Sequence, residues 1–168
     1  YSAGSYCCNG ITLPDRELSS GALAVKEAYR YVDFKAADLE NGKILLRNRY
    51  DFTNLSEFEI LYTVECDSKT ICEGKAANST LRPHASKKLT LKYDLPKTCR
   101  LGCYLNIFVA LKKDTLWAKA GYEVASAQFE LPVKVCGELE STSFGKIEKT
   151  ENNEFITVTG YNFKYVFN

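Results

Sequence analysis

Alternation of apolar and polar side chains with a period of two is the sequence feature that most constrains this fold. The pattern is longest at residues 58–66, where an apolar set alternates with a mostly charged and polar one. The apolar set is Phe58, Ile60, Tyr62, Val64 and Cys66. Successive side chains of a β-strand point to opposite faces of its sheet, so the pattern predicts a strand with one buried and one largely solvated face.

Shorter alternations recur along the middle of the chain. The predicted strands cover residues 32–36, 44–49, 58–66, 70–75, 89–93, 105–111 and 123–131. Turn residues such as Asn41-Gly42 and Arg82-Pro83 separate them, with no helical pattern in between. Many short, evenly spaced strands are typical of antiparallel sheets packed face to face. We therefore predict an all-β fold, an immunoglobulin-like antiparallel β-sandwich with one short N-terminal helix.

The helix is predicted just before the first strand. Ser19 and Ser20 can cap a helix start, and charged residues lie off the apolar stripe that follows. The apolar residues at helical spacing are Leu18, Ala22, Val25, Ala28 and Tyr29. We expect one short amphipathic helix here.

These patterns divide the chain into three segments. Residues 1–30 hold an irregular start and the helix, and residues 31–132 hold the β-sandwich. Residues 133–168 are predicted to form a linker and the first strands of a second β domain. We expect a short strand at 133–136, a polar and turn-rich segment at 137–145, alternation at 155–159 and a hairpin-like pair at 161–167. Two strands alone are marginal in water, so we expect this second domain to be cut off. A chain that starts at Tyr1 and contains no Met also suggests a piece of a longer protein.

Charge and hydropathy disfavour two classes of partner. There are 22 Lys and Arg residues against 21 Asp and Glu, a net charge of +1, which supplies no basic field for a nucleic-acid backbone. No apolar run approaches the roughly 18 to 20 residues that a membrane span needs, and the start lacks a signal-peptide pattern. We expect neither a nucleic-acid nor a membrane partner.

Seven cysteines are many for 168 residues, but their spacing does not indicate a metal site. None forms a CxxC pair, and the single histidine, His84, follows a proline in a turn-like segment. We expect most of the thiols to be small buried apolar groups. Cys66 and Cys72 could face each other across a hairpin and form a disulfide in an oxidising compartment.

Catalytic motifs are scarce. A nucleophilic triad or a Cys-His dyad would need His84, which is better interpreted as a surface histidine. Phosphate-binding glycine loops are absent from the sequence. Paired carboxylates would suffice for glycosidic chemistry, but most acidic residues occupy the polar parity of predicted strands. Glu123 differs because it lies in the compact segment 117–125, although nothing in that segment is its evident chemical partner.

Trp117, the only tryptophan, has two interpretations. With Tyr122 it could form an aromatic platform that stacks on sugar rings. A single tryptophan in a small sandwich is more often a core residue or an anchor at a domain interface, and we favour that structural role.

Two sequence motifs resemble those of a known family. Residues 48–56, NRYDFTNLS, and residues 114–125, DTLWAKAGYEVA, with Gln128-Phe129 after them, strongly resemble large bacterial β-galactosidases of glycoside hydrolase family 2. The similar region of that family is the domain that follows the catalytic barrel, and the likeness runs in order from about Asn9 to Pro132. Tyr122 stands where the family usually has His, and Ser126-Ala127 replaces its usual Trp.

The resemblance implies a role for each segment of the chain and places the catalytic residues outside it. Residues 1–30 would be the exit from the barrel and a lead-in helix, and the tail would open the last β domain. The family's two catalytic glutamates and its Mg and monovalent-cation sites lie outside the matching region, so no catalytic, cofactor or metal residue is assigned here. The parent would be a retaining hydrolase of terminal β-galactosides, and this fragment alone would be inactive.

The resemblance also implies partners. The domain would space the barrel from the C-terminal domain and would support contacts with other domains of its own chain or with other subunits. The compartment of such a bacterial parent, cytoplasm or periplasm, stays open. The alternative is a free-standing carbohydrate-binding or adhesion β-sandwich module.

Overall fold

The computed structural model describes residues 10–13, 15–77, 80–136, 145–152 and 154–168. Contacts divide the chain into two units, Tyr1–Gly137 and Glu138–Asn168, which are described separately. The sequence-based division into segments 1–30, 31–132 and 133–168 stays a prediction.

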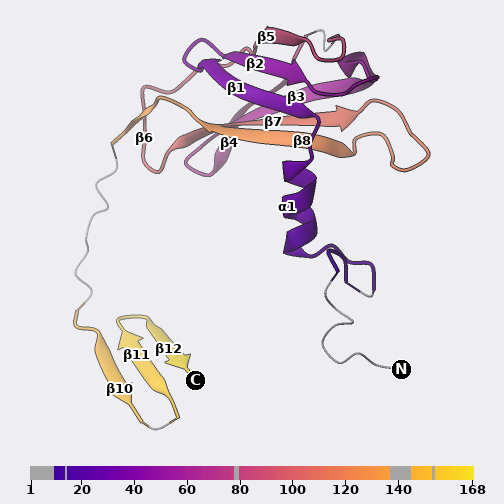
Figure 1. Cartoon of the computed structure of the whole chain (residues 1–168). Coiled ribbons are helices and arrows are strands. Elements are labelled where there is room, and N and C mark those ends of the chain that lie inside the picture. Colours follow the sequence, from indigo (N-terminus) through magenta and orange to yellow (C-terminus); the bar gives the residue numbers. More distant parts are fainter. Residues whose placement is uncertain (1–9, 14, 78–79, 137–144, 153) are drawn as a thin grey trace, which may run out of the picture. The chain divides into compact units, whose positions relative to one another are not determined.

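The first unit is a sandwich of two antiparallel sheets (Figure 1). One sheet has the order β1-β2-β5, formed by Val32–Asp38, Lys43–Asn48 and Ser86–Thr90. The other has the order β4-β3-β7-β8, formed by Lys69–Lys75, Phe58–Cys66, Cys103–Leu111 and Glu123–Glu130. With the single short helix before β1, this confirms the predicted all-β immunoglobulin-like fold.

The core lies between the two sheets, on the faces that the alternation predicted. Along β3, alternate residues from Phe58 to Cys66 are buried, and β7 buries the matching parity from Cys103 to Leu111. Ile60, Leu105 and Ile107 have no solvent exposure. At roughly 25 cal/mol per Å² of apolar surface, burial of these aliphatic and aromatic side chains is the main stabilising contribution.

Asn48, at the end of β2, is the one fully buried polar residue among those the structure describes. Its amide nitrogen donates to the carbonyls of Thr53 and Leu81, at 2.9 and 3.0 Å, and its oxygen accepts from the backbone N–H of Tyr50 at 2.9 Å. The side chain therefore ties the β2 exit to the segment that precedes β5, and every polar atom of the amide group is used.

Helix α1 spans Ser20–Ala28 and confirms the predicted helix. Ser19 is its N-cap, because the hydroxyl oxygen accepts from the N–H of Ala22 at 3.2 Å. None of its nine residues is buried. Within the described residues, no helix has the length and apolar character needed to cross a membrane.

Some strand bounds differ from the prediction. The fifth strand, β5, covers Ser86–Thr90 rather than 89–93, because Leu91 leaves the ladder to donate to the carbonyl of Gly42. A parallel two-residue ladder joins β6, Thr98–Cys99, to β9, Lys134–Val135. Two residues are too few to display an alternation, so β6 was missed, whereas a short strand at 133–136 was predicted. The 3₁₀ turn η2, Leu55–Glu57, precedes β3.

The second unit is a three-stranded antiparallel sheet with the order β10-β11-β12. Its strands are Glu148–Glu151, Ile156–Gly160 and Phe163–Phe167. The predicted hairpin corresponds to β11 and β12, which pair from Ile156 opposite Phe167. Strand β10 was not predicted, because its sequence EKTE has no apolar face and all four residues are exposed. The predicted polar segment 137–145 lies mostly outside the described residues.

Candidate functional site

Aromatic side chains, most of them exposed, lie at one end of the sandwich. The registers place the starts of β1, β3 and β8 beside the ends of β2 and β7, so that Val32 lies opposite Asn48 and Phe58 opposite Leu111. Five aromatic residues gather on the loops of this end, which we call the aromatic pole. They are Tyr31, Tyr50, Phe52, Trp117 and Tyr122.

The β7–β8 loop, which presents Trp117, is held by a carboxylate. Asp114 accepts from the backbone N–H of Ala120 at 3.0 Å and from Lys119 Nζ at 2.7 Å. These two hydrogen bonds lower the pKa of Asp114 below its ordinary value. The hydroxyl of Thr115 also donates to the carbonyl of Ala118 at 3.0 Å, and Gly121 adopts a left-handed φ of +85° that suits glycine. The loop is therefore internally ordered.

This ordered loop directs large apolar side chains into solvent. Trp117 is 65% exposed, and Leu116 beside it is fully exposed. The interpretation of Trp117 as a core residue is wrong, because its loop lies outside the two sheets. Its ring meets the ring of Tyr122 edge to face, with centroids 5.4 Å apart. Tyr122 is thus an aromatic neighbour of Trp117.

Helix α1 reaches the same pole through charged side chains. Lys26 Nζ lies 4.9 Å from the centroid of the Tyr122 ring, a cation–π contact. Arg30 donates to the carbonyl of Ser126 in β8 at 2.8 Å and pairs with Glu27. Sequence reasoning singled out neither Lys26 nor Asp114. A turn containing Asp followed by Thr is a signal for Asp114, but Lys26 lies off the apolar stripe and carries no such signal.

His84 and Glu123, the other residues considered for catalysis, lie beside residues of this end of the sandwich. His84 is exposed, as predicted, and its Nε2 lies 3.0 Å from Oδ1 of Asp51. Glu123 is half-buried at the start of β8 and lies opposite Ala110 in the register. Within the described part of the chain, no hydrogen bond or ion pair joins either residue to a thiol or to a second carboxylate.

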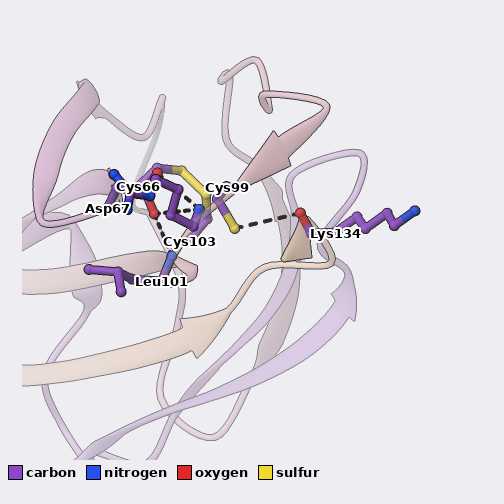
Figure 2. The surroundings of a disulfide bond; sticks show 7 residues. Cys66, Asp67, Cys99, Leu101, Cys103 and Lys134 are labelled. Carbon is purple, nitrogen blue, oxygen red and sulfur yellow. Dashed lines mark hydrogen bonds between the residues drawn. A yellow bond between two sulfur atoms is a disulfide. The ribbon is translucent and has the colours of Figure 1, made fainter. Parts of the chain in front are cut away.

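The opposite end of the sandwich holds a disulfide, shown in Figure 2. It joins Cys66, the last residue of β3, to Cys103, the first of β7. The predicted pairing of Cys66 with Cys72 is wrong, because the β3–β4 register places Cys66 opposite Lys69 and Cys72 opposite Val64. Cys72 is a half-buried free thiol.

Asp67, next to the disulfide, anchors the loop that leads into β7. Its Oδ1 accepts from the N–H groups of Leu101 at 2.7 Å and Arg100 at 2.9 Å (Figure 2). These backbone donors lower the pKa of Asp67 below its ordinary value. Cys99 is a buried thiol, and it donates to the carbonyl of Lys134 at 3.8 Å. Beside them lies an open depression of about 610 Å³, which Cys66, Asp67, Ile71 and Leu101 help to line.

The carboxylates with lowered pKa values have structural partners. Lys43 and Asn41 lower the pKa of Asp38, as backbone amides do for Asp67 and Asp114. Over the described ranges, no three His, Cys, Asp or Glu side chains are grouped to hold a metal ion. The chemistry that the described geometry supports best is non-covalent contact at the aromatic pole.

Comparison with known proteins places the sandwich in a sequence family. Residues 44–132, more than half of the chain, match the family model described as β-galactosidase, domain 4. The chain is similar to proteins named β-galactosidase from Priestia megaterium, at 34% identity over 166 residues, and Clostridium acetobutylicum, at 31% over 163 residues. These alignments cover 98% and 95% of this chain but only 16% and 17% of the relatives. The chain thus spans about one sixth of their length.

Proposed function

The chain belongs to the β-galactosidase domain 4 family, and we propose that it is the non-catalytic β-sandwich module of a longer β-galactosidase. In this role the sandwich spaces the catalytic part of the parent from its C-terminal part and supplies contacts to both. The parent hydrolyses terminal β-galactosides with retention, through two glutamates outside this chain. Its Mg and monovalent cations bind outside this chain as well.

One observation carries the proposal. The family match covers most of both sheets, from β2 to the end of β8, so the resemblance belongs to the folded sandwich rather than to a short motif. The chemistry of the described side chains supports the same role. Asp38, Asp67 and Asp114 hold turns and loops, and Asn48 locks a strand exit.

Turnover of a chromogenic β-galactoside tests the proposal. The purified 168-residue chain is expected to show no activity above a mock preparation from the same host, which lacks its own β-galactosidase. The longer protein that contains this chain is expected to be active. Activity of the pure chain, or a longer protein that is folded but inactive on every β-galactoside, would contradict the proposed function.

A second candidate function is binding of carbohydrate by a free-standing module. The exposed Trp117 ring on an ordered loop, with Tyr122 beside it, is the observation that favours it. Quenching of Trp117 fluorescence by galactosides or plant polysaccharides would support this function if Trp117→Ala abolished binding without unfolding the sandwich. No spectral change at millimolar sugar would rule the platform out.

A further inference from the structure

We propose that the aromatic pole, together with the exposed apolar side chains of α1, is the surface on which the preceding part of the parent polypeptide packs. The proposal rests on the proposed function, since it assigns a partner to one end of the module. The large exposed apolar residues of α1 are Leu23 and Val25, with Leu18 and Tyr29 just outside its ends, and Leu116 extends the aromatic pole.

Helix α1 requires a covering partner. It has nine residues, whereas isolated helices shorter than about 12 to 15 residues are marginal in water. Lys26 of the helix contacts the Tyr122 ring, and Arg30, two residues after the helix, bonds to Ser126, but none of the nine helical residues is buried. Leu23 is 55% exposed and Tyr29 is 74% exposed. A helix with this pattern gains its stability when another surface buries the apolar side chains.

The aromatic pole has the composition of a binding hot spot. Trp and Tyr are enriched in the residues that dominate protein–protein interfaces, and the pole exposes Trp117, Tyr31 and Tyr122. The hydrogen bonds of Asp114 hold the Trp117 loop in place before any partner binds. Less side-chain and loop freedom is then lost on association.

The two surfaces are continuous. Lys26 of α1 lies over the ring of Tyr122, which in turn contacts Trp117. A small cavity of about 160 Å³ between α1 and β8 is lined by residues that include Leu23 and Val124. One partner can therefore cover both the helix and the loop.

The position of α1 in the chain identifies the occupant. It is the element before β1, so polypeptide that enters the sandwich arrives along this surface. The relatives are about six times as long as this chain and supply ample polypeptide for the purpose. A sugar ligand would stack on Trp117 but would gain nothing from a fully exposed Leu116 or from the exposed apolar side chains of α1. Protein therefore fits the surface better than carbohydrate.

Hydrogen–deuterium exchange of the full-length natural protein tests this docking. Peptides from 18–30 and 112–123 are expected to exchange at least about tenfold more slowly in the full-length protein than in the 168-residue chain. Amides of β3 and β7 serve as the internal folding control and should be protected in both. The full-length protein is measured at two concentrations, and its galactosidase activity is measured in the same preparation.

Paired variants of the full-length protein sharpen the test. Leu116→Ser with Trp117→Ala removes the centre of the proposed contact, and exchange of 18–30 is expected to rise about tenfold while β3 and β7 stay protected. The control is Ile71→Ser, which changes another exposed apolar side chain at the opposite end, beside the disulfide, and should leave exchange of 18–30 unchanged.

The remaining outcomes contradict either the docking or the proposed function. Equal exchange of 18–30 and 112–123 in the short and full-length proteins overturns the docking, and if that full-length protein cleaves galactosides the proposed function stands. The docking is also overturned if peptides 18–30 and 112–123 are already protected in the short chain, or if they become protected only when sugar is added or the protein concentration is raised. Each of these results assigns the surface to another occupant. Absence of any longer protein in the source cell contradicts the proposed function itself.

Discussion

Cys66 and Cys103 lie directly opposite each other in the β3–β7 register, and a disulfide joins their side chains. Cys66 is the last residue of β3 and Cys103 is the first residue of β7, and both side chains are buried on the inward face of the sheet. The bond therefore closes one end of the larger sheet, while the aromatic pole occupies the other end.

Loss of this disulfide is expected to destabilise the sandwich. The bond spans a sequence separation of 37 residues, for which the chain-entropy model gives about 4 kcal/mol. The double variant Cys66→Ser with Cys103→Ser should lower the free energy of unfolding in urea by about 2–4 kcal/mol relative to the oxidised protein. Cys72→Ser is the control and should cost less than about 1 kcal/mol, because this thiol is free and half-buried. Equal losses in both variants, or a Cys66–Cys72 peptide after non-reducing digestion, would contradict the assignment.

Removal of the Asn48 amide is expected to be costly. Asn48→Ala removes the amide partner of the Thr53 carbonyl and of the Tyr50 N–H, and leaves the Leu81 carbonyl with only the N–H of Leu55 as donor. The free energy of unfolding should fall by about 1–3 kcal/mol in chemical denaturation. Asn106→Ala is the matched control, since Asn106 bonds to Gln128 on the partly exposed face of the same sandwich and should cost under about 1 kcal/mol. Similar losses of unfolding free energy in the two variants would contradict the claim that burial of the Asn48 amide network makes its removal costly.

Acid is expected to release the loop that Asp67 holds. Backbone N–H groups of Leu101 and Arg100 lower its pKa in the folded state below the ordinary value of 3.8. The stabilisation is therefore fully present above about pH 4 and is lost as pH falls through the folded pKa. Thermal midpoints measured from pH 6 to pH 2.5 should fall less steeply below pH 4 in Asp67→Asn than in the natural sequence. The exposed Asp94→Asn should keep the original slope, and identical slopes in all three proteins would refute the role of Asp67.

Loosening of the Trp117 loop is expected when Asp114 is removed. Asp114→Ala breaks the bonds to Ala120 and Lys119 on an exposed loop, so the sandwich itself should be little affected. The steady-state fluorescence anisotropy of Trp117 should fall, while the thermal midpoint stays within about 3 °C. Glu130→Ala, at the far end of β8, is the control and should leave the anisotropy unchanged. An unchanged anisotropy in Asp114→Ala would mean that other contacts order the loop.

Strand identity was predictable wherever an element has one apolar face. The bounds of β3 were predicted correctly because all five inward positions of 58–66 are apolar. Strand β10 has no apolar face, and the Thr98–Cys99 ladder is too short for any period to show. Such elements are set by pairing with a neighbour, which local sequence does not encode.

Pairing across long separations limited prediction of the sites. Cys66 and Cys72 are close in sequence, but β3 also pairs with β7, which brings in Cys103 from 37 residues away. Both partners share the inward parity of their strands, and that is the signal that identifies the pair once the neighbour is known. Trp117 and Tyr122 were named from sequence, whereas the contact of Tyr122 with Lys26 depends on where α1 packs.

The central claim is that this sandwich is part of a longer β-galactosidase. Immunodepletion of a source-cell extract with antibody raised against the chain tests it most directly, with an immunoblot of the captured protein. The account predicts a captured band several times larger than 18.9 kDa, together with loss of β-galactoside hydrolysis from the depleted extract. A single band near 19 kDa, with hydrolysis left intact in the extract, would contradict it.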